Sequence, residues 1–287
     1  MKPELYIIEC KSNLHVGSGD SNYGVIDKLI QRDTTDQLPC IYSSSLKGAF
    51  CEYFEEVIEK DKEKGKKELS DLIFGGGDNK KSSKLSKGSH IFHQAFLLSI
   101  PLRSNRRTHY NSIAPMMAGQ LLEMSKLFTY ELPDNLKKEL EFVKALQPKD
   151  GKPIVFENKK DLEIEDFVEE DFVVVDAIVT PLPKLKEIIG DEVIILSDSD
   201  MKRLTNDYHL PIIARNKLEN GKSQNLWYEQ VLPRKSVFTA FVVNGSKDQT
   251  KDDFKANVEG KTVQIGGDSS VGYGYCHVYS LPKTVQP

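Results

Sequence analysis

Residues 14–33 of this chain read LHVGSGDSNYGVIDKLIQRD. The stretch places Gly17, Gly19 and Gly24 among small polar residues and then presents Asp27 after Val-Ile. Glycine adopts backbone angles that a Cβ forbids and lets another chain come close to the backbone. The stretch lacks the Lys-Ser/Thr of a Walker loop and the spacing of a dinucleotide-binding turn. It indicates either a loop that holds a phosphate or a nucleic-acid strand, or an ordinary loop between strands.

The composition is that of a soluble globular protein. The 287 residues suffice for one large domain or two small ones, and 39% of them are apolar. No apolar run approaches the ~20 residues of a membrane span, and the first residues lack the pattern of a signal peptide. We therefore expect a cytoplasmic protein. The four cysteines form no Cys-x-x-Cys pair, which argues against a zinc site or a disulfide framework.

Charge is unevenly distributed along the chain. The net charge of −4 argues against a protein that coats nucleic acid through a bulk positive field. Residues 79–110 nevertheless contain seven lysines and arginines and no acid, whereas acids dominate residues 157–171. The pattern predicts separate basic and acidic surfaces. Within the basic stretch, the Lys/Ser-rich residues 79–88 are predicted to be mobile.

Residues 43–58 form the clearest predicted helix, with apolar residues at the i, i+3, i+4 and i+7 spacing of one buried stripe. Serines at its start can cap free amide groups, and Lys47 falls in the first turn, where the helix dipole disfavours a cation. Ser44, Ser45 and Lys47 thus suit an anion such as a phosphate. The alternative is an ordinary capped helix with a solvated lysine.

The middle of the chain gives weaker signals. Residues 90–102 predict a strand that ends in the basic cluster beginning at Arg103, and arginine binds phosphates through two parallel hydrogen bonds; a solvated basic turn is the alternative. Residues 114–128 predict a helix, residues 133–170 read as irregular and charged, and residues 172–179 predict a buried strand.

Residues 210–232 predict a β-hairpin around Asn220-Gly221, a strong turn signal. Its arms carry Arg215, Trp227 and Tyr228, which suit a hairpin that inserts into a nucleic-acid strand and stacks on bases. Alternatively, Trp227 packs in a core and Glu229 neutralises Arg215. A second glycine-rich loop follows in residues 263–274, with glycines at Gly266, Gly267, Gly272 and Gly274.

Strand-like segments interleaved with helices indicate an α+β fold. Five blocks, LHVGSG…GVIDKLIQRD, PCIYSSSLKGAF, FHQAFLLSIPLRS, NLWYEQVLP and IGGDSSVGYGY, resemble the RAMP superfamily of CRISPR proteins. Their order and coverage are most similar to the multicopy backbone subunit of the type III-B (Cmr) effector complex. Residues 132–200 carry no matching motif.

The resemblance implies one RAMP-type domain over residues 1–287, with a modified ferredoxin-like (RRM-related) core. It implies a protruding thumb hairpin over residues 205–232 and an insertion-rich region over 132–200. In this family several copies stack along one CRISPR guide RNA, and the target RNA is cut at regularly spaced displaced bases in antiviral defence. The implied partners are guide RNA, target RNA, other copies of the chain, other RAMP-type subunits and the large subunit, with no membrane.

The resemblance also implies roles for particular residues. Asp27 would be the residue whose loop cuts the target RNA, with His15, Tyr228 and Glu229 near the cut. Guide phosphates would be held by Ser44, Lys47, Arg103 and the loop of Gly266–Gly274. With the residues singled out above, the predicted RNA-binding set is Gly17, Gly19, Ser44, Ser45, Lys47, Arg103, Arg215, Gly266, Gly267, Gly272 and Gly274.

The chemistry expected of Asp27 follows from its pKa, which is about 3.9 in an ordinary aspartate. An ionised carboxylate is a weak base but a good ligand for Mg²⁺ or another divalent cation. We therefore expect a metal-dependent endoribonuclease in which a 2′-hydroxyl attacks the adjacent phosphate in line. The alternatives are a structural guide-binding subunit without catalysis, in which Asp27 only caps a turn, and an endonuclease that processes guide precursors.

Overall fold

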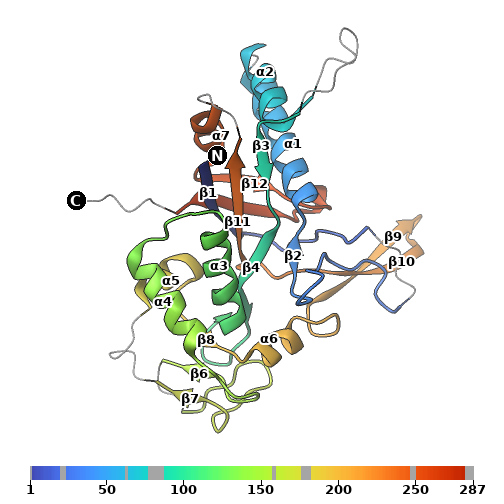
Figure 1. Ribbon diagram of the computed structural model, residues 1–287. Helices are drawn as coiled ribbons and strands as arrows, with labels where there is room; N and C mark the ends of the chain where they lie inside the picture. The colour runs from blue at the N-terminus through green and yellow to red at the C-terminus, as the bar shows by residue number, and fades with distance from the viewer. Residues whose placement is uncertain are drawn as a thin grey trace.

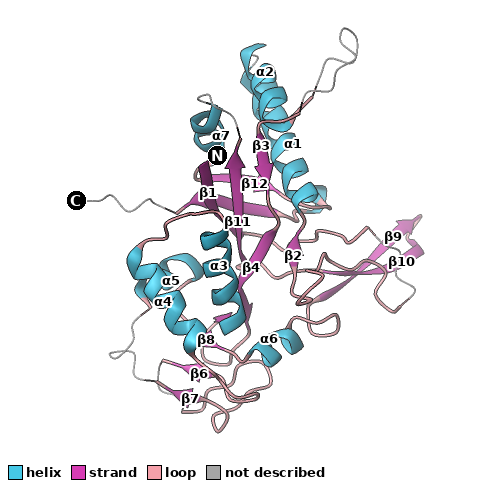
Figure 2. Ribbon diagram, viewed as in Figure 1, coloured by secondary structure: helices cyan, strands magenta, loops and turns pink. Residues whose placement is uncertain are grey.

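The computed structural model describes residues 2–19, 24–61, 64–76, 87–156, 160–175, 182–245 and 250–281 (Figure 1). In the interior of its main sheet lies β1 (Lys2–Cys10), which pairs antiparallel with β11 (Val237–Asn244) and β13 (Tyr275–Ser280). Residues 5–8 of β1 and all of β11 are buried. Such continuous apolar strands need cover on both faces, and helices provide it (Figure 2).

The sheet runs in the order β12-β13-β1-β11-β4-β5-β8-β6-β7, with β2 paired to β4 and β3 paired to β11. Its pairings are antiparallel except for β5 with β8 and β6 with β7. Both ends of the chain therefore meet in one sheet, and the fold is a mixed α/β fold. The remaining strands are β2 (Cys40–Ile41), β3 (His90–Phe92), β4 (Ala95–Leu102), β5 (Tyr110–Ile113), β6 (Ile154–Val155), β7 (Val173–Val174), β8 (Val193–Ile195) and β12 (Lys261–Gln264).

Aromatic contacts show how helices cover the two faces. The predicted helix is present as α1 (Ser43–Asp61), followed by α2 (Lys64–Phe74). Phe254 of α7 (Thr250–Val258) contacts Tyr6 of β1 and Phe50 of α1, with ring centroids 5.8 and 5.4 Å apart. On the opposite face, Phe128 at the end of α3 (Pro115–Leu127) packs on Phe241 of β11 at 4.8 Å.

Two predictions about the middle of the chain are wrong. Residues 133–170 are not all irregular, because α4 (Asp134–Ala145) buries Leu136, Leu140 and Val143 against the core. In the segment predicted to be a buried strand, only Val173 and Val174 form a strand, and both are exposed; residues 176–179 lie outside the described part of the chain. The same region contains α5 (Pro183–Ile189) and α6 (Asp198–Leu204). Residues 77–86, which hold most of the predicted mobile segment, are also outside it.

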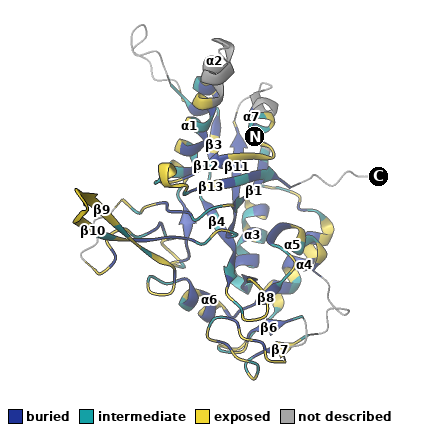
Figure 3. Cartoon of the chain, turned by 180° about the vertical axis from the view of Figure 1, so that it is seen from behind, coloured by how far each residue is buried: buried dark blue, intermediate teal, exposed yellow. Residues whose placement is uncertain are grey.

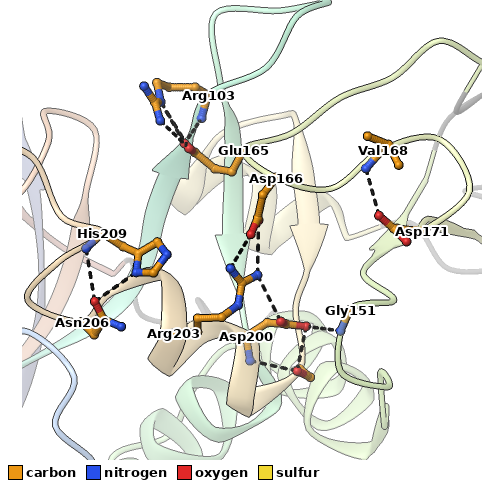
Figure 4. A network of polar contacts seen from close by, with 11 residues as sticks. Arg103, Gly151, Glu165, Asp166, Val168, Asp171, Asp200, Arg203, Asn206 and His209 are labelled. Carbon is orange, nitrogen blue, oxygen red and sulfur yellow. Dashed lines mark hydrogen bonds and ion pairs between the residues drawn. The ribbon is translucent and has the colours of Figure 1, made fainter.

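The predicted basic and acidic stretches touch at one place in the described part of the chain. Arg103, at the end of β4, forms a bidentate ion pair with Glu165 of the acidic stretch, and Arg203 of α6 pairs with Asp166 (Figure 4). Asn105 donates to the carbonyl of Asp161 at 2.9 Å. The basic cluster that begins at Arg103 thus packs against the acidic loop around Glu165.

The predicted hairpin is confirmed. It consists of β9 (Ile212–Glu219) and β10 (Lys222–Gln230), and it protrudes from the body with most of its surface exposed (Figure 3). Asn220 and Gly221 both have positive φ, 50° and 76°. These are the angles of a two-residue turn whose twist matches the strands, which explains the Asn-Gly pair.

Candidate functional site

Asp27 is exposed at the base of the hairpin, on a loop that pairs with the free edge of β10. The amides of Asp27 and Lys28 donate to the carbonyl of Tyr228 at 3.1 Å, and the amide of Gln230 donates to the carbonyl of Lys28 at 2.9 Å. Oδ2 of Asp27 accepts a hydrogen bond from the amide of Tyr228 at 2.7 Å. The Asp27 carboxylate is therefore both solvent-accessible and fixed to the hairpin by backbone contacts.

Glu229, predicted to lie near the cut, has a fully buried carboxylate. Its Oε1 lies 2.6 Å from Lys28 Nζ and accepts from Trp227 Nε1 at 2.6 Å, and its Oε2 lies 2.8 Å from Arg215 Nη1. Burial alone would raise the pKa of Glu229, but the hydrogen bonds from Lys28, Arg215 and Trp227 outweigh burial and lower the pKa to about 2. The Glu229 carboxylate is thus ionised and buried, and both of its oxygens already contact other side chains.

His15 is also buried, with 5% of its surface exposed. Its Nδ1 lies 2.7 Å from the carbonyl of Gln230, so Nδ1 carries the proton and donates it. Its Nε2 would lie 3.2 Å from a Cβ at Gly17. His15 therefore connects the first glycine-rich loop to the base of the hairpin, in a position closed to solvent.

The second glycine-rich loop packs against the same segment. The amide of Gly267 donates to the carbonyl of His15, and the amide of Gly274 donates to that of Asn13. A Cβ at Gly266 would overlap the His15 carbonyl, and both Gly266 and Gly274 have positive φ. Only glycine fits these two positions. The two loops, distant in sequence, form one surface beside the hairpin.

The start of α1 joins this surface through Gln31. Gln31 Nε2 donates to the carbonyl of Gly17 at 3.1 Å and to Ser45 Oγ at 2.8 Å. Ser44 is exposed, and Lys47 is half-buried and forms no ion pair with another described residue. The structure therefore brings the predicted phosphate seat beside the first glycine-rich loop.

The hairpin has two chemically different faces, because cross-strand partners share a face and alternate residues oppose each other. Trp227 pairs with Arg215, and both lie on the face with Glu229. Tyr228 pairs with Ala214, and Leu226 pairs with Asn216. This second face exposes its apolar side chains, with 53% of Leu226 and 36% of Tyr228 accessible.

Arg103 was predicted to bind guide phosphates, but the structure pairs it with a different part of the chain. Its side chain is 90% exposed, but it pairs with Glu165 in the region of residues 160–175. Lys28, Gln31 and Asp268 were missed by the sequence reasoning. Lys28 directly follows Asp27 and Asp268 stands among the glycines of the second loop, so their position in the motifs was the available signal.

The site does not contain a preformed metal centre in the part of the chain that the structure describes. No three His, Cys, Asp or Glu side chains gather there as metal ligands. Asp27 offers one carboxylate, and no described residue donates to its Oδ1. Such a carboxylate fits Mg²⁺ only as one ligand among waters and phosphate oxygens.

A β-sheet of this order, with two glycine-rich loops beside a protruding hairpin, defines the class of protein. The chain belongs to the RAMP superfamily, which it matches over residues 7–277. It is 25% identical to the CRISPR system Cmr endoribonuclease Cmr4 of Pyrococcus furiosus, over 97% of this chain and 95% of that protein.

Solved structures share the fold. A chain in the cryo-EM structure of Type III-B Cmr-beta bound to cognate target RNA superimposes with a TM-score of 0.74 and 21% identity, covering 98% of this chain and 97% of that one. Oligomeric Cmr4 from Pyrococcus furiosus superimposes with a TM-score of 0.69 and 18% identity, covering 98% of both chains. Among the described helices, none has the length and apolar character needed to cross a bilayer.

Proposed function

We propose that this protein is a guide-RNA-binding subunit of a type III-B CRISPR effector complex that cleaves target RNA through its Asp27 loop. The observation that carries the proposal is an exposed carboxylate, fixed by backbone hydrogen bonds at the base of a protruding hairpin, in a RAMP chain. The relative from Pyrococcus furiosus is named an endoribonuclease, which supports cleavage. We propose that the core has a modified ferredoxin-like arrangement. The antiparallel strands β1, β11 and β13, covered by α1 and α7, support this.

Guide RNA would lie across the two glycine-rich loops and the start of α1. Gly19 and Gly272 have open space where a Cβ would stand, which lets RNA approach the backbone closely. Gly17, Gly266, Gly267 and Gly274 would shape the same surface. Ser44 and Lys47 stand at the positive end of the α1 dipole. These contacts are to phosphate and sugar, so one protein accepts any guide sequence. Arg103 would join this set where a phosphate displaces Glu165.

The hairpin would separate bases of the guide–target duplex. Its exposed apolar face, with Leu226 and Tyr228, offers surface for an unstacked base, and aromatic side chains stack on bases without sequence preference. Asp27 lies against the backbone of Tyr228. A nucleotide displaced by the hairpin would therefore have its sugar-phosphate linkage next to the carboxylate.

In the proposed reaction the 2′-hydroxyl attacks the adjacent phosphorus and gives its proton to Asp27, which passes it to water. The P–O5′ bond breaks and the leaving 5′ oxygen takes a proton from water, so a cyclic phosphate and a 5′-hydroxyl result. Oδ1 of Asp27 accepts a hydrogen bond from the attacking hydroxyl and so orients it. Oδ2 stays hydrogen-bonded to the Tyr228 amide. Holding reactants in line supplies several kcal/mol of such a barrier, about 7–11 at most. A weakly bound Mg²⁺, held by Asp27 and phosphate oxygens, would stabilise the charge on the phosphate. His15 and Glu229 are positioning residues in this proposal, because both are buried.

The partners follow from the same proposal: guide RNA, target RNA, further copies of this chain, other RAMP-type subunits and the large subunit, in the cytoplasm. The relative crystallised as oligomeric Cmr4 supports self-association. A head-to-tail contact that does not close on itself would build a filament along the guide.

The test is cleavage of labelled complementary RNA by the assembled, guide-loaded complex, with and without Mg²⁺. Asp27→Asn keeps an oxygen for the Tyr228 amide and should slow cleavage at least about hundredfold, with target binding unchanged. Asp134→Asn, an exposed aspartate at the start of α4, is the matched control. Retained cleavage by Asp27→Asn would overturn the assignment. Cutting of precursor RNA by the isolated subunit would instead support guide processing.

A further inference from the structure

One guanidinium joins the hairpin to the second glycine-rich loop. Nη1 of Arg215 lies 2.8 Å from Glu229 Oε2 and 2.6 Å from Asp268 Oδ1. Its Cζ lies 5.7 Å from the ring centre of Trp227 and 5.9 Å from that of Tyr273. Arg215 is therefore enclosed by two carboxylates and two rings, and only 21% of its side chain is exposed. This arrangement differs from that of an arginine whose guanidinium is free to bind a phosphate.

Asp268 is held in place by its own loop. It adopts a left-handed φ of 62°, and its carbonyl accepts hydrogen bonds from the amides of Val271 and Tyr273. Aspartate tolerates this conformation better than most residues. The carboxylate is thus presented to Arg215 by a turn whose backbone is already fixed, and the neighbouring Gly267 is bonded to the carbonyl of His15.

The contacts continue from Arg215 to the cleavage loop. Glu229 accepts Arg215 on Oε2 and Lys28 on Oε1, and Lys28 directly follows Asp27. The resulting series, Asp268–Arg215–Glu229–Lys28, contains two acids and two bases and links three elements that are separate in sequence. Because the side chain of Glu229 is fully buried, both of its ion pairs are screened less than a pair on the surface would be, although half of the Lys28 side chain is exposed.

We propose that Asp268 and Arg215 are positioning residues for cleavage, which set the angle of the hairpin against the glycine-rich loop and so the place of the Asp27 carboxylate. The inference rests on the proposed function. Asp268 does not touch the reacting atoms; it acts through Arg215, Glu229 and Lys28. RNA held by the glycine-rich loop would thereby fix the position of a carboxylate on a different element.

The rival account is that Arg215 binds RNA phosphate directly. The two accounts make opposite predictions for Asp268→Asn. If Arg215 is a phosphate ligand, removal of its carboxylate partner frees it, so RNA binds as well or better and cleavage is maintained. If Arg215 is a positioning residue, the same change slows cleavage while target binding stays unchanged.

The experiment measures single-turnover cleavage of saturating target RNA and, separately, target affinity, in the assembled guide-loaded complex. We expect Asp268→Asn to lower the cleavage rate about tenfold, since small misplacements of a reacting group are costly, with affinity within about twofold. Asp268→Glu, which keeps a carboxylate, should recover part of the rate. Glu192→Gln is the control, because it removes the partner of another arginine, Arg107, outside the site.

A double variant completes the test. Arg215→Lys keeps the charge but lacks the planar fork, and its rate loss should not add to that of Asp268→Asn, because both break one contact. Wild-type cleavage by Asp268→Asn, or an affinity loss equal to its rate loss, would overturn the inference. Failure of the proposed function would look different: Asp27→Asn would then cleave normally, or the wild-type complex would not cleave at all.

Discussion

Lys28 Nζ lies 2.6 Å from Glu229 Oε1, so the residue after Asp27 is ion-paired with a carboxylate that has no exposed surface. The two residues are 201 positions apart in sequence. A charge with no access to water must keep its partners, because separating them costs far more than breaking a surface pair. The position of the Asp27 loop therefore depends on an internal ion pair, and the strength of this pair can be measured.

Glu229→Gln should destabilise the protein at pH 7 by about 3 kcal/mol, because the folded pKa of about 2 lies below the reference value of 4.5. A lowered folded pKa contributes stability that is complete above the reference value and is lost as pH falls toward 2. The difference between wild type and variant in chemical denaturation should therefore shrink below pH 4.5. Glu123→Gln, on the exposed face of α3, is the control. A stability difference between wild type and Glu229→Gln that stays constant across this pH range would contradict the assignment.

Acid should also destabilise the core through His90. Burial lowers the pKa of His90 from 6.5 to about 4. Above pH 6.5 the residue is neutral in both states, and between these values only the unfolded chain takes up a proton, so stability falls by about 3 kcal/mol. His90→Phe, beside Phe92 and Phe254, should flatten this part of the stability–pH curve. His209→Asn, at an exposed histidine, is the control.

His15→Asn should retain most of the cleavage rate, whereas His15→Ala should lose about tenfold or more. Asparagine places its amide nitrogen close to the position of Nδ1 and can still donate to the Gln230 carbonyl. The measurement is the rate of the assembled complex against pH for wild type and both variants. If His15 exchanged protons in the reaction, His15→Asn would fail as badly as His15→Ala and the profile would change its shape.

Gly274→Ala should cost more stability than Gly272→Ala. Both residues have positive φ, 79° and 85°, so each alanine bears a backbone penalty of about 1–2 kcal/mol. A Cβ at Gly272 meets open space, whereas one at Gly274 would overlap the carbonyl of Ile265. The difference should exceed about 1 kcal/mol in thermal unfolding of the two variants. Equal costs would show that the loop can move away from β12.

Local chemistry explains which elements were predictable. Asn220-Gly221 defines its turn because both residues accept positive φ, and the apolar stripe of α1 needs no distant partner to be recognised. Helix α4 was missed although Leu136, Leu140 and Val143 have helical spacing, because the charged residues around them resemble a loop. The sequence alone does not show that such a charged helix packs against a hydrophobic core.

The individual residues of the site were predictable, but most of the contacts between their charged side chains were not. Asp27 is accessible, as its motif suggested, and the two glycine-rich loops do meet. The alternative in which Glu229 neutralises Arg215 is confirmed. The sequence could not show that this pair is shared with Lys28 and Asp268. Arg103 shows the same limit, since its partner Glu165 lies in a region without a motif. Long-range pairing of charges is a property of the folded chain.

The loop of Asp27 pairs with the root of β10, whereas the outer arms of the hairpin contact no other described strand. Length can therefore change at the tip without moving the carboxylate. Since side chains alternate along a strand, two residues added to each arm would preserve both faces and extend the reach by roughly 7 Å. A single added residue per arm would turn the apolar side chains beyond it to the opposite face. The length of the hairpin and the character of its two faces can thus be changed separately, and a designer could lengthen the hairpin in steps of two residues per arm.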